Sequence, residues 1–171
     1  MKSLPTRVIG IGQPAAGDDN AGIAVVRALR EQPLPPGVEI HEVTDPALLI
    51  DLLDGIRYAI LIDALVSEDN PGNIVFLTPD ELATCRAMPL SSHGMSVTDA
   101  IELVNTLASN SIPGNIHIIG ITIASPGHYS HAMSAAITAA VPRAAGLITQ
   151  LLENKKFHVV PDTELADSQT G

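Results

Sequence analysis

Two carboxylates and one imidazole stand at positions from which they could hold a divalent metal ion. Asp19 follows the β-branched stretch 7–12. Asp63 ends the continuous apolar run 57–63, and His93 shortly precedes a predicted helix. Carboxylate oxygens and an imidazole nitrogen suit a borderline ion such as Ni²⁺ or Zn²⁺, and three protein ligands leave coordination positions open for outside groups. The sequence therefore predicts a metal site formed by Asp19, Asp63 and His93.

These three residues are far apart in sequence, but the carboxyl ends of parallel strands meet at one edge of an open sheet. Each residue also has a structural interpretation. Asp18 or Asp19 could cap the first helix, Asp63 could accept loop N–H groups, and His93 could be a hydrogen-bonded structural histidine. Their shared placement at one edge favours the metal site, with Asp18 in a loop-capping or ligand-orienting role. The other histidines lack acid partners at comparable positions and are expected to be structural or exposed: His41, His117, His128, His131 and His158.

The elements that must position these residues alternate between strand and helix patterns. Strands are predicted at residues 7–12, 38–43, 57–63, 74–77 and 115–122. Helices are predicted at residues 19–30, 45–53, 79–88, 96–107 and 130–153, with a Ser96–Asp99 capping box opening the fourth. The strand 74–77 follows an Asn-Pro-Gly-Asn turn, so it is expected to run antiparallel to its neighbour.

This alternation predicts a three-layer α/β/α fold with a twisted, mostly parallel sheet of about five strands, one of them antiparallel. We expect residues 1–160 to form a single domain. Residues 161–171 are polar and acidic without periodicity, which predicts a disordered tail. The sequence does not specify an oligomeric state, and a monomer is the default expectation.

The amino-acid composition narrows the possible binding partners of the protein and its cellular compartment. The chain has 171 residues, and its 9 Lys plus Arg against 19 Asp plus Glu give a net charge of −10. Nucleic acid and anionic membranes require basic patches, so neither is expected as a partner. No secretory signal is seen, and no apolar run reaches the roughly 18 residues of a membrane span. Cys85 is the only cysteine, which excludes an internal disulfide and favours the cytoplasm.

A dinucleotide-binding site is a weaker interpretation of the first strand-to-helix corner. Gly10, Gly12 and Ala15 approximate the Gly-x-Gly-x-x-Gly fingerprint, and Glu42 could be the acid that binds the ribose. However, Pro14 and the acid pair disturb the helix N-terminus that should hold the pyrophosphate.

Nucleophilic catalysis has less support. No Gly-x-Ser-x-Gly elbow surrounds Ser91, Ser92 or Ser96. Cys85 has no nearby histidine, so a buried or half-buried helix position is its expected role.

The order of the motifs resembles that of the maturation endopeptidases of [NiFe] hydrogenases. The resemblance covers nearly the whole domain, through Val8-Ile-Gly-Ile-Gly-Gln-Pro14, Leu61-Ile-Asp-Ala64, Asn70-Pro-Gly72, Ser91-Ser-His-Gly-Met-Ser96 and Ile119-Gly-Ile-Thr122. It implies that Asp19, Asp63 and His93 form the metal site. It also implies cleavage of a short C-terminal extension from the nickel-loaded large-subunit precursor, with nickel supplied by that substrate.

The chain departs from the family pattern at three places. Gln13 replaces the usual Asn, and Asn20 replaces the Gly that commonly follows the acid pair. Residues 42–45 replace an Asp-Gly-Gly type turn whose loop is thought to help recognise the precursor, so substrate choice is the property most affected. A second class of function stays open, namely a metal-dependent checkpoint that binds the precursor without cutting it.

Overall fold

The computed structural model describes residues 4–68, 70–85, 88–89, 94–107, 116–125 and 130–154. Its strands are β1 (Thr6–Ile11), β2 (Val38–Val43), β3 (Tyr58–Val66), β4 (Ile74–Leu77), β5 (Met88–Pro89) and β6 (Ile116–Ile123). They form one sheet in the order β2-β1-β3-β6-β4, and the short β5 pairs with β3 beside this path. The strands of the mostly parallel sheet are therefore close to those predicted, and β5 is an additional strand that the sequence pattern did not indicate.

The longer strands of the sheet run parallel, with β4 as the exception. β1 runs parallel to β2 and β3, and β3 runs parallel to β6, whereas β4 is antiparallel to β6. The turn before β4 is fastened by the buried Thr122, whose hydroxyl donates to the carbonyl of Asn70 at 2.7 Å and accepts from the N–H of Asn73 at 3.0 Å. This turn reverses the chain, so the antiparallel prediction for residues 74–77 is confirmed.

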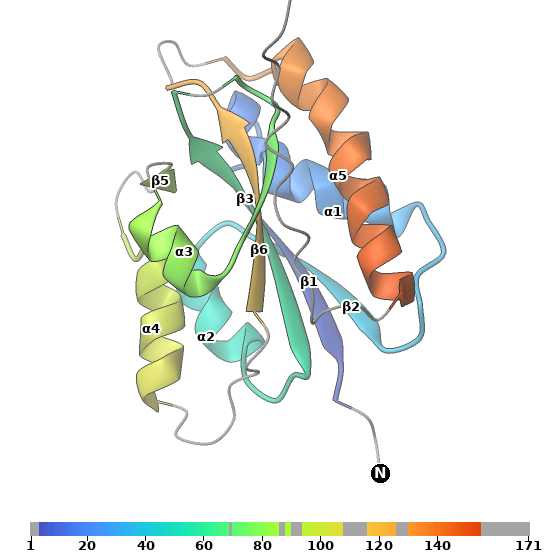
Figure 1. Ribbon diagram of the computed structural model, residues 1–171, viewed down its shortest axis with the longest axis vertical. Coiled ribbons are helices and arrows are strands. Elements are labelled where there is room, and N and C mark those ends of the chain that lie inside the picture. The colour runs from blue at the N-terminus through green and yellow to red at the C-terminus, as the bar shows by residue number, and fades with distance from the viewer. Residues whose placement is uncertain are drawn as a thin grey trace, which may run out of the picture.

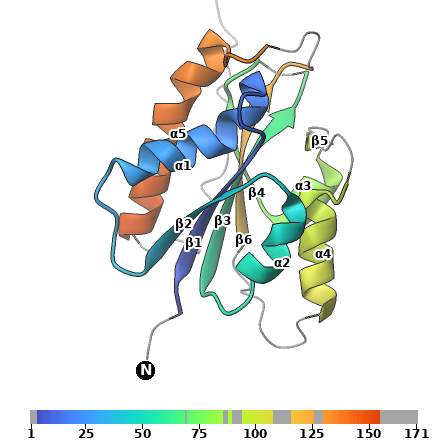
Figure 2. The same cartoon turned by 180° about the vertical axis from the view of Figure 1, so that it is seen from behind.

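Helices cover both faces of the sheet (Figures 1 and 2). They are η1 (Gly17–Asn20), α1 (Ala21–Arg30), η2 (Pro46–Leu48), α2 (Leu49–Leu52), α3 (Pro79–Thr84), α4 (Val97–Leu107) and α5 (Ala135–Asn154). One apolar cluster joins the sheet to α1 and α5, and a second joins it to α2, α3 and α4. The predicted three-layer α/β/α architecture is confirmed.

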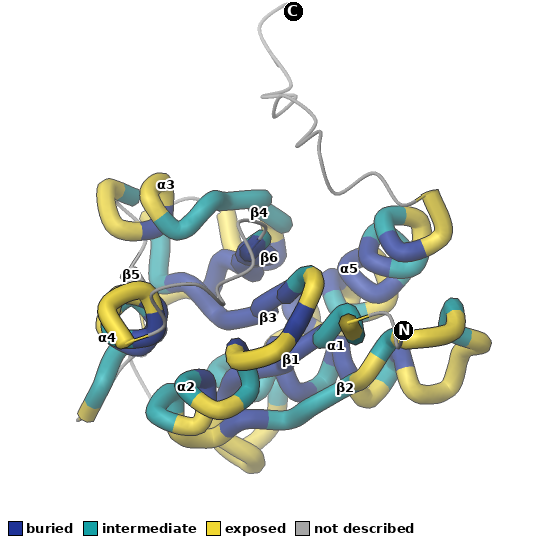
Figure 3. The backbone as a smooth tube through the Cα atoms, turned by 90° about the horizontal axis from the view of Figure 1, so that it is seen from below, coloured by how far each residue is buried: buried dark blue, intermediate teal, exposed yellow. Residues whose placement is uncertain are grey.

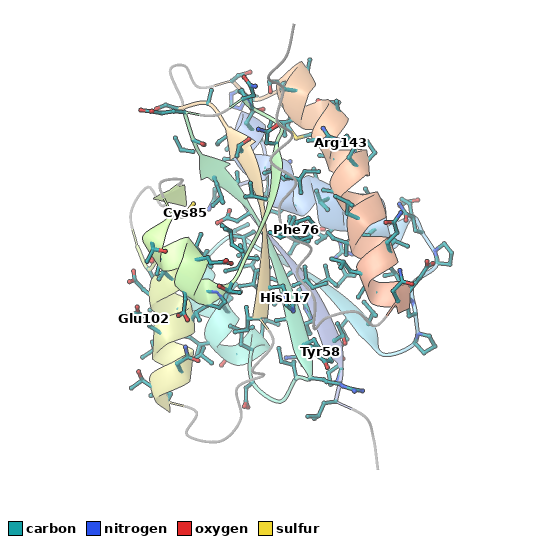
Figure 4. All side chains as sticks on the ribbon, in the orientation of Figure 1. Tyr58, Phe76, Cys85, Glu102, His117 and Arg143 are labelled. Atoms are coloured by element: carbon teal, nitrogen blue, oxygen red, sulfur yellow. The ribbon has the colours of Figure 1, made fainter. Side chains whose placement is uncertain are left out.

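The central strands are buried from both sides, as their continuous apolar sequences predict. Along β3, Ile60 and Ile62 face the cluster of α1 and α5, while Leu61 and Leu65 face the other cluster. Figure 3 shows β3 and β6 as the buried centre of the molecule. Side chains fill the space between the sheet and its helices (Figure 4). Because aromatic residues are only 2% of the chain, this core is mostly aliphatic.

The largest errors in the predicted boundaries, of three residues or more, occur at three places. The strand predicted to end at Asp63 continues to Val66, because it still has β6 and β5 as neighbours. The third helix ends at Thr84 instead of residue 88, since the extended backbone of Cys85 leads the chain towards β5. The last helix begins at Ala135 instead of residue 130, because residues 130–134 contact the β1–α1 loop.

Helix α5 is long and apolar enough to cross a membrane by length and composition, with a mean hydropathy of 1.3. A core helix passes the same test, and one side of α5 is buried against α1 and the sheet through residues such as Ile137, Ala144 and Ile148. We therefore interpret α5 as a core helix. The predicted tail, residues 161–171, lies outside the described residues.

Candidate active site

Asp19 lies in the one-turn helix η1, which connects β1 to α1. The sequence predicted a helix from residue 19, whereas the α-helix proper begins at Ala21. The backbone of Asp19 packs closely on β1, since a Cβ added at Gly12 would lie 2.4 Å from its carbonyl oxygen. The Asp19 side chain is half-buried, and this loss of hydration raises the pKa of its carboxyl group.

Asp63 is a buried acid in the middle layer, with 7% of its surface exposed. It lies between Leu61 and Leu65 on the face covered by α2, α3 and α4. Its Oδ1 accepts the N–H of Ala64 at 2.9 Å. Burial raises the pKa of Asp63 to about 7, the hydrogen bond from Ala64 opposes this rise, and the negative charge of Asp19 adds to it. Asp19 is therefore close enough to influence the ionisation of Asp63.

The neighbouring strand explains this proximity. The β1–β3 ladder ends at the pair Gly10 and Ile62, so Asp63 is the first residue of β3 beyond it. The first turn of α1 fills this corner, because a Cβ added at Gly22 would lie 2.3 Å from the carbonyl oxygen of Ile62. Only a glycine permits such an approach. Asp63 thus stands at the carboxyl end of the β1–β3 ladder, beside the turn that carries Asp19, although its own strand continues.

His93, the third predicted ligand, lies outside the described residues, as do Ser91 and Ser92. The flanking elements are described. Pro89 of β5 pairs with Leu65, and the predicted capping box of α4 is confirmed by reciprocal 3.0 Å hydrogen bonds between Ser96 and Asp99. Within the described ranges no group of three His, Cys, Asp or Glu side chains is arranged to hold a metal ion. The three-ligand site therefore stays a prediction.

Asp18 does not cap its own helix. Its Oδ1 accepts the backbone N–H of Ser134 at 2.6 Å, just before α5. Neither η1 nor α1 has a side-chain cap. The loop-capping role predicted for Asp18 is confirmed, with the partner supplied by a segment distant in sequence. Nothing in the sequence pattern pointed to Ser134.

The alternative sites lose support from their surroundings. Glu42, the candidate ribose ligand, belongs to β2 and is engaged by Arg27 at 2.8 Å and by Arg30 of α1. Ser96 takes part in the α4 capping box. Cys85, labelled in Figure 4, is half-buried as predicted, but it follows α3 in an extended conformation and is not part of the helix.

The acid pair has the donor chemistry of a cation site. The ion pairs of the described residues involve Glu39 and Glu42, so neither Asp19 nor Asp63 has an Arg or Lys partner there. Two neighbouring carboxylates, one of them buried, destabilise each other's charged form unless a cation joins them. Carboxylate oxygens here fit a divalent metal that brings further ligands of its own.

Sequence comparison identifies the family. The sequence model of HycI, described as hydrogenase maturation protease, matches residues 23–151. The chain belongs to the hydrogenase maturation protease family. Members of this family are peptidases that cleave the C-terminal extension of the hydrogenase large subunit, as the resemblance of the motifs implied. Among curated protein sequences, none is significantly similar to this chain.

Solved structures of hydrogenase maturation proteases share the fold. The endopeptidase HybD from Escherichia coli superposes with a TM-score of 0.75 at 20% identity, over 90% of this chain and 94% of that one. HybD from Thermococcus kodakarensis gives 0.68 at 25% identity, over 87% and 99%. HycI from the same archaeon gives 0.65 at 22% identity, over 88% and 94%. The fold of this chain thus agrees with the family that its sequence identifies.

Proposed function

We propose that Asp19, Asp63 and His93 dock the nickel ion of a [NiFe] hydrogenase large-subunit precursor and thereby align its C-terminal extension for cleavage. The observation that carries this proposal is the acid pair, which has no cationic partner among the described residues and in which the Asp19 charge raises the pKa of Asp63. A metal arriving with the precursor would relieve this repulsion. Binding of the precursor would then also complete the active site, because the precursor brings the metal.

Chain connectivity supports His93 as the nitrogen ligand. β5 pairs with β3 at Leu65, two positions beyond Asp63 on the same face of the sheet. Gly94 is separated by one residue from Ser96, which opens the capping box of α4. In the sequence, His93 stands between β5, which pairs with the end of β3, and α4, which packs on the face of the sheet that carries Asp63.

The acids have no nucleophile among them, so the chain's contribution is binding and orientation. Nickel supplied by the precursor is a Lewis acid that can polarise the scissile carbonyl or activate a water molecule. By binding that ion, Asp19 and Asp63 would fix the position of the extension relative to it, and such positioning alone can lower a barrier by several kcal/mol. Asp63 must release its proton to bind, which its raised pKa of about 7 allows near neutral pH.

The test is incubation of the protein with nickel-containing precursor, followed by mass measurement of the large subunit. The proposal requires loss of the C-terminal extension with the nickel-loaded precursor and none with the nickel-free form. Stable binding of the loaded precursor without cleavage would instead support the checkpoint function.

We expect the purified protein to hold nickel weakly. Three protein ligands without cysteine leave the coordination shell incomplete until the precursor contributes its own groups. Calorimetric titration of the isolated protein with Ni²⁺ should therefore give weak binding that dialysis reverses. A stoichiometric metal that survives dialysis would indicate a resident ion and an ordinary metallohydrolase.

Substrate choice is expected to depend on the loop after β2, where this chain departs from its relatives. Gln13 donates from Nε2 to the carbonyl of Thr44 at 2.7 Å, and Asp45 accepts the N–H of Ala47 at 2.9 Å. These bonds fix the loop beside the turn of Asp19. Gln13→Ala should raise KM for the precursor several-fold, on the order of one lost hydrogen bond, with kcat near wild type. An unchanged KM would show that this loop does not contact the precursor.

The expected setting is the cytoplasm, with the precursor as partner. The acidic composition and single cysteine favour it. We propose a monomer that needs neither nucleic acid nor membrane for its reaction.

A further inference from the structure

The segment before α5 is clamped onto the turn that carries Asp19. Three contacts join segments more than a hundred positions apart in the sequence. Asp18 Oδ1 accepts the N–H of Ser134 at 2.6 Å, and the carbonyl of Ala15 accepts a hydrogen bond from Nδ1 of His131 at 2.8 Å. Gly17 lies so close that an added Cβ would be 2.4 Å from the carbonyl oxygen of Ser130.

The clamp holds a backbone that would otherwise relax. Ala15 has a φ of 61° and Gly17 a φ of 59°, so both occupy the left-handed region. A non-glycine residue is strained there, and it keeps this conformation only where its surroundings fix it. The carbonyl of Ala15 and the Cα of Gly17 are the groups that His131 and Ser130 contact. The loop is thus held in an unfavourable conformation from the α5 side.

Asp18 makes the only charge-assisted bond of these three contacts. A carboxylate that accepts a backbone N–H forms a shorter and stronger bond than a neutral acceptor. It also lies at the N-terminal end of α5, where the helix dipole favours a negative charge. In Figures 1 and 2 the N-terminal ends of α1 and α5 lie together, near the ends of β3 and β6.

We propose that Asp18 is a positioning residue for Asp19: its bond to Ser134 fixes the η1 turn so that the neighbouring carboxylate faces the docked metal. This inference rests on the proposed function of the Asp19–Asp63 pair. Asp19 is held from the other side by Gly12, the residue that follows β1. Its backbone is therefore clasped between the first strand and the last helix, and Asp18 supplies the bond on the helix side.

The experiment compares Asp18→Ala, Asp18→Asn and a matched control, Glu81→Ala. Glu81 also accepts one backbone N–H at a helix start, from Thr78 at 2.7 Å, but it lies on α3, which follows β4 and is away from the Asp19 turn. Asp18→Ala should lower kcat/KM for nickel-loaded precursor by roughly 10- to 100-fold, as for groups that orient metal ligands. Asp18→Asn keeps an acceptor oxygen and should recover most of the activity. Glu81→Ala should lower Tm comparably and keep wild-type processing.

Amide hydrogen exchange gives a readout independent of activity. Peptides spanning residues 17–20 and 130–134 should exchange faster in Asp18→Ala than in wild type or Glu81→Ala. Unchanged exchange, wild-type processing by Asp18→Ala, or equal loss in Glu81→Ala would overturn the positioning role. If wild type itself leaves the precursor uncut, the proposed function fails, while the exchange data still decide whether Asp18 fixes the turn.

Discussion

Asp63→Asn abolishes processing of nickel-loaded precursor, lowering kcat/KM by more than 100-fold while the protein stays folded. Even groups that only orient metal ligands cost roughly 10- to 100-fold when removed, and a direct ligand should cost more. The amide removes the anionic oxygen that binds the metal but keeps the shape of the buried side chain, which is 7% exposed in β3. The measurement is single-turnover cleavage followed by mass spectrometry. Asp19→Asn, on the facing turn, should behave in the same way.

The matched control is Asp80→Asn, which removes one carboxylate from the exposed first turn of α3. It changes the net charge of the protein by the same amount and should process precursor at the wild-type rate. Wild-type cleavage by Asp63→Asn would make this acid structural and remove the basis of the docking mechanism. Equal losses in Asp63→Asn and Asp80→Asn would point to overall charge as the relevant property.

Local patterns in the sequence were sufficient to predict most of the fold. The buried strands β3 and β6 are continuous aliphatic runs, and the capping box of Ser96 and Asp99 places the start of α4 correctly. The Asn-Pro-Gly-Asn turn specified the antiparallel β4. Each of these signals lies within about ten neighbouring residues, the range over which periodicity and turn chemistry act.

Features that depend on contacts between distant parts of the chain could not be predicted from the sequence. The helix was predicted from residue 130, but Ser134 caps α5 by accepting the N–H of Ile137 at 3.4 Å, and residues 131 and 134 bind Ala15 and Asp18 instead of continuing the helix. β5 has two residues and exists because it pairs with the end of β3. Together with β6, it pairs with the residues of β3 beyond Asp63, where the apolar run suggested a boundary.

The residue types of the candidate site, and the edge of the sheet at which they are expected, could be predicted from the sequence. The carboxyl-edge rule for parallel sheets placed Asp19 and Asp63 together before any contact was known. Their electrostatic coupling supports that inference. The burial of Asp63 between Leu61 and Leu65 could not be predicted with the same certainty, since it depends on the helices that cover this face. That burial determines how the protein responds to pH.

Asp63→Asn is also expected to make the metal-free protein more stable than wild type above neutral pH. In the unfolded chain Asp63 has its ordinary pKa of 3.8, whereas burial raises the folded pKa to about 7. Between these values the folded protein holds a proton that the unfolded chain has released. Stability therefore falls as pH rises from about 4 to about 7 and levels off above. At about 1.36 kcal/mol per pKa unit, the loss is a few kcal/mol.

Asparagine does not titrate, so the variant avoids this loss. Its buried amide needs hydrogen-bond partners and can cost about 1 to 3 kcal/mol, but this penalty is the same at every pH. The diagnostic quantity is therefore the slope of the difference in stability between the two proteins against pH. The free energy of unfolding of Asp63→Asn relative to wild type should increase between about pH 4 and pH 7 and stay constant above.

The measurement is urea unfolding in metal-free buffer at a series of pH values, with Asp80→Asn as the control that should show no such slope. Adding Ni²⁺ should stabilise wild type more than Asp63→Asn, because the ion binds the ionised acid. A difference between wild type and Asp63→Asn that does not change with pH would show that Asp63 is ionised throughout. In that case a partner other than the arriving metal compensates its charge, and the repulsion that drives docking is absent.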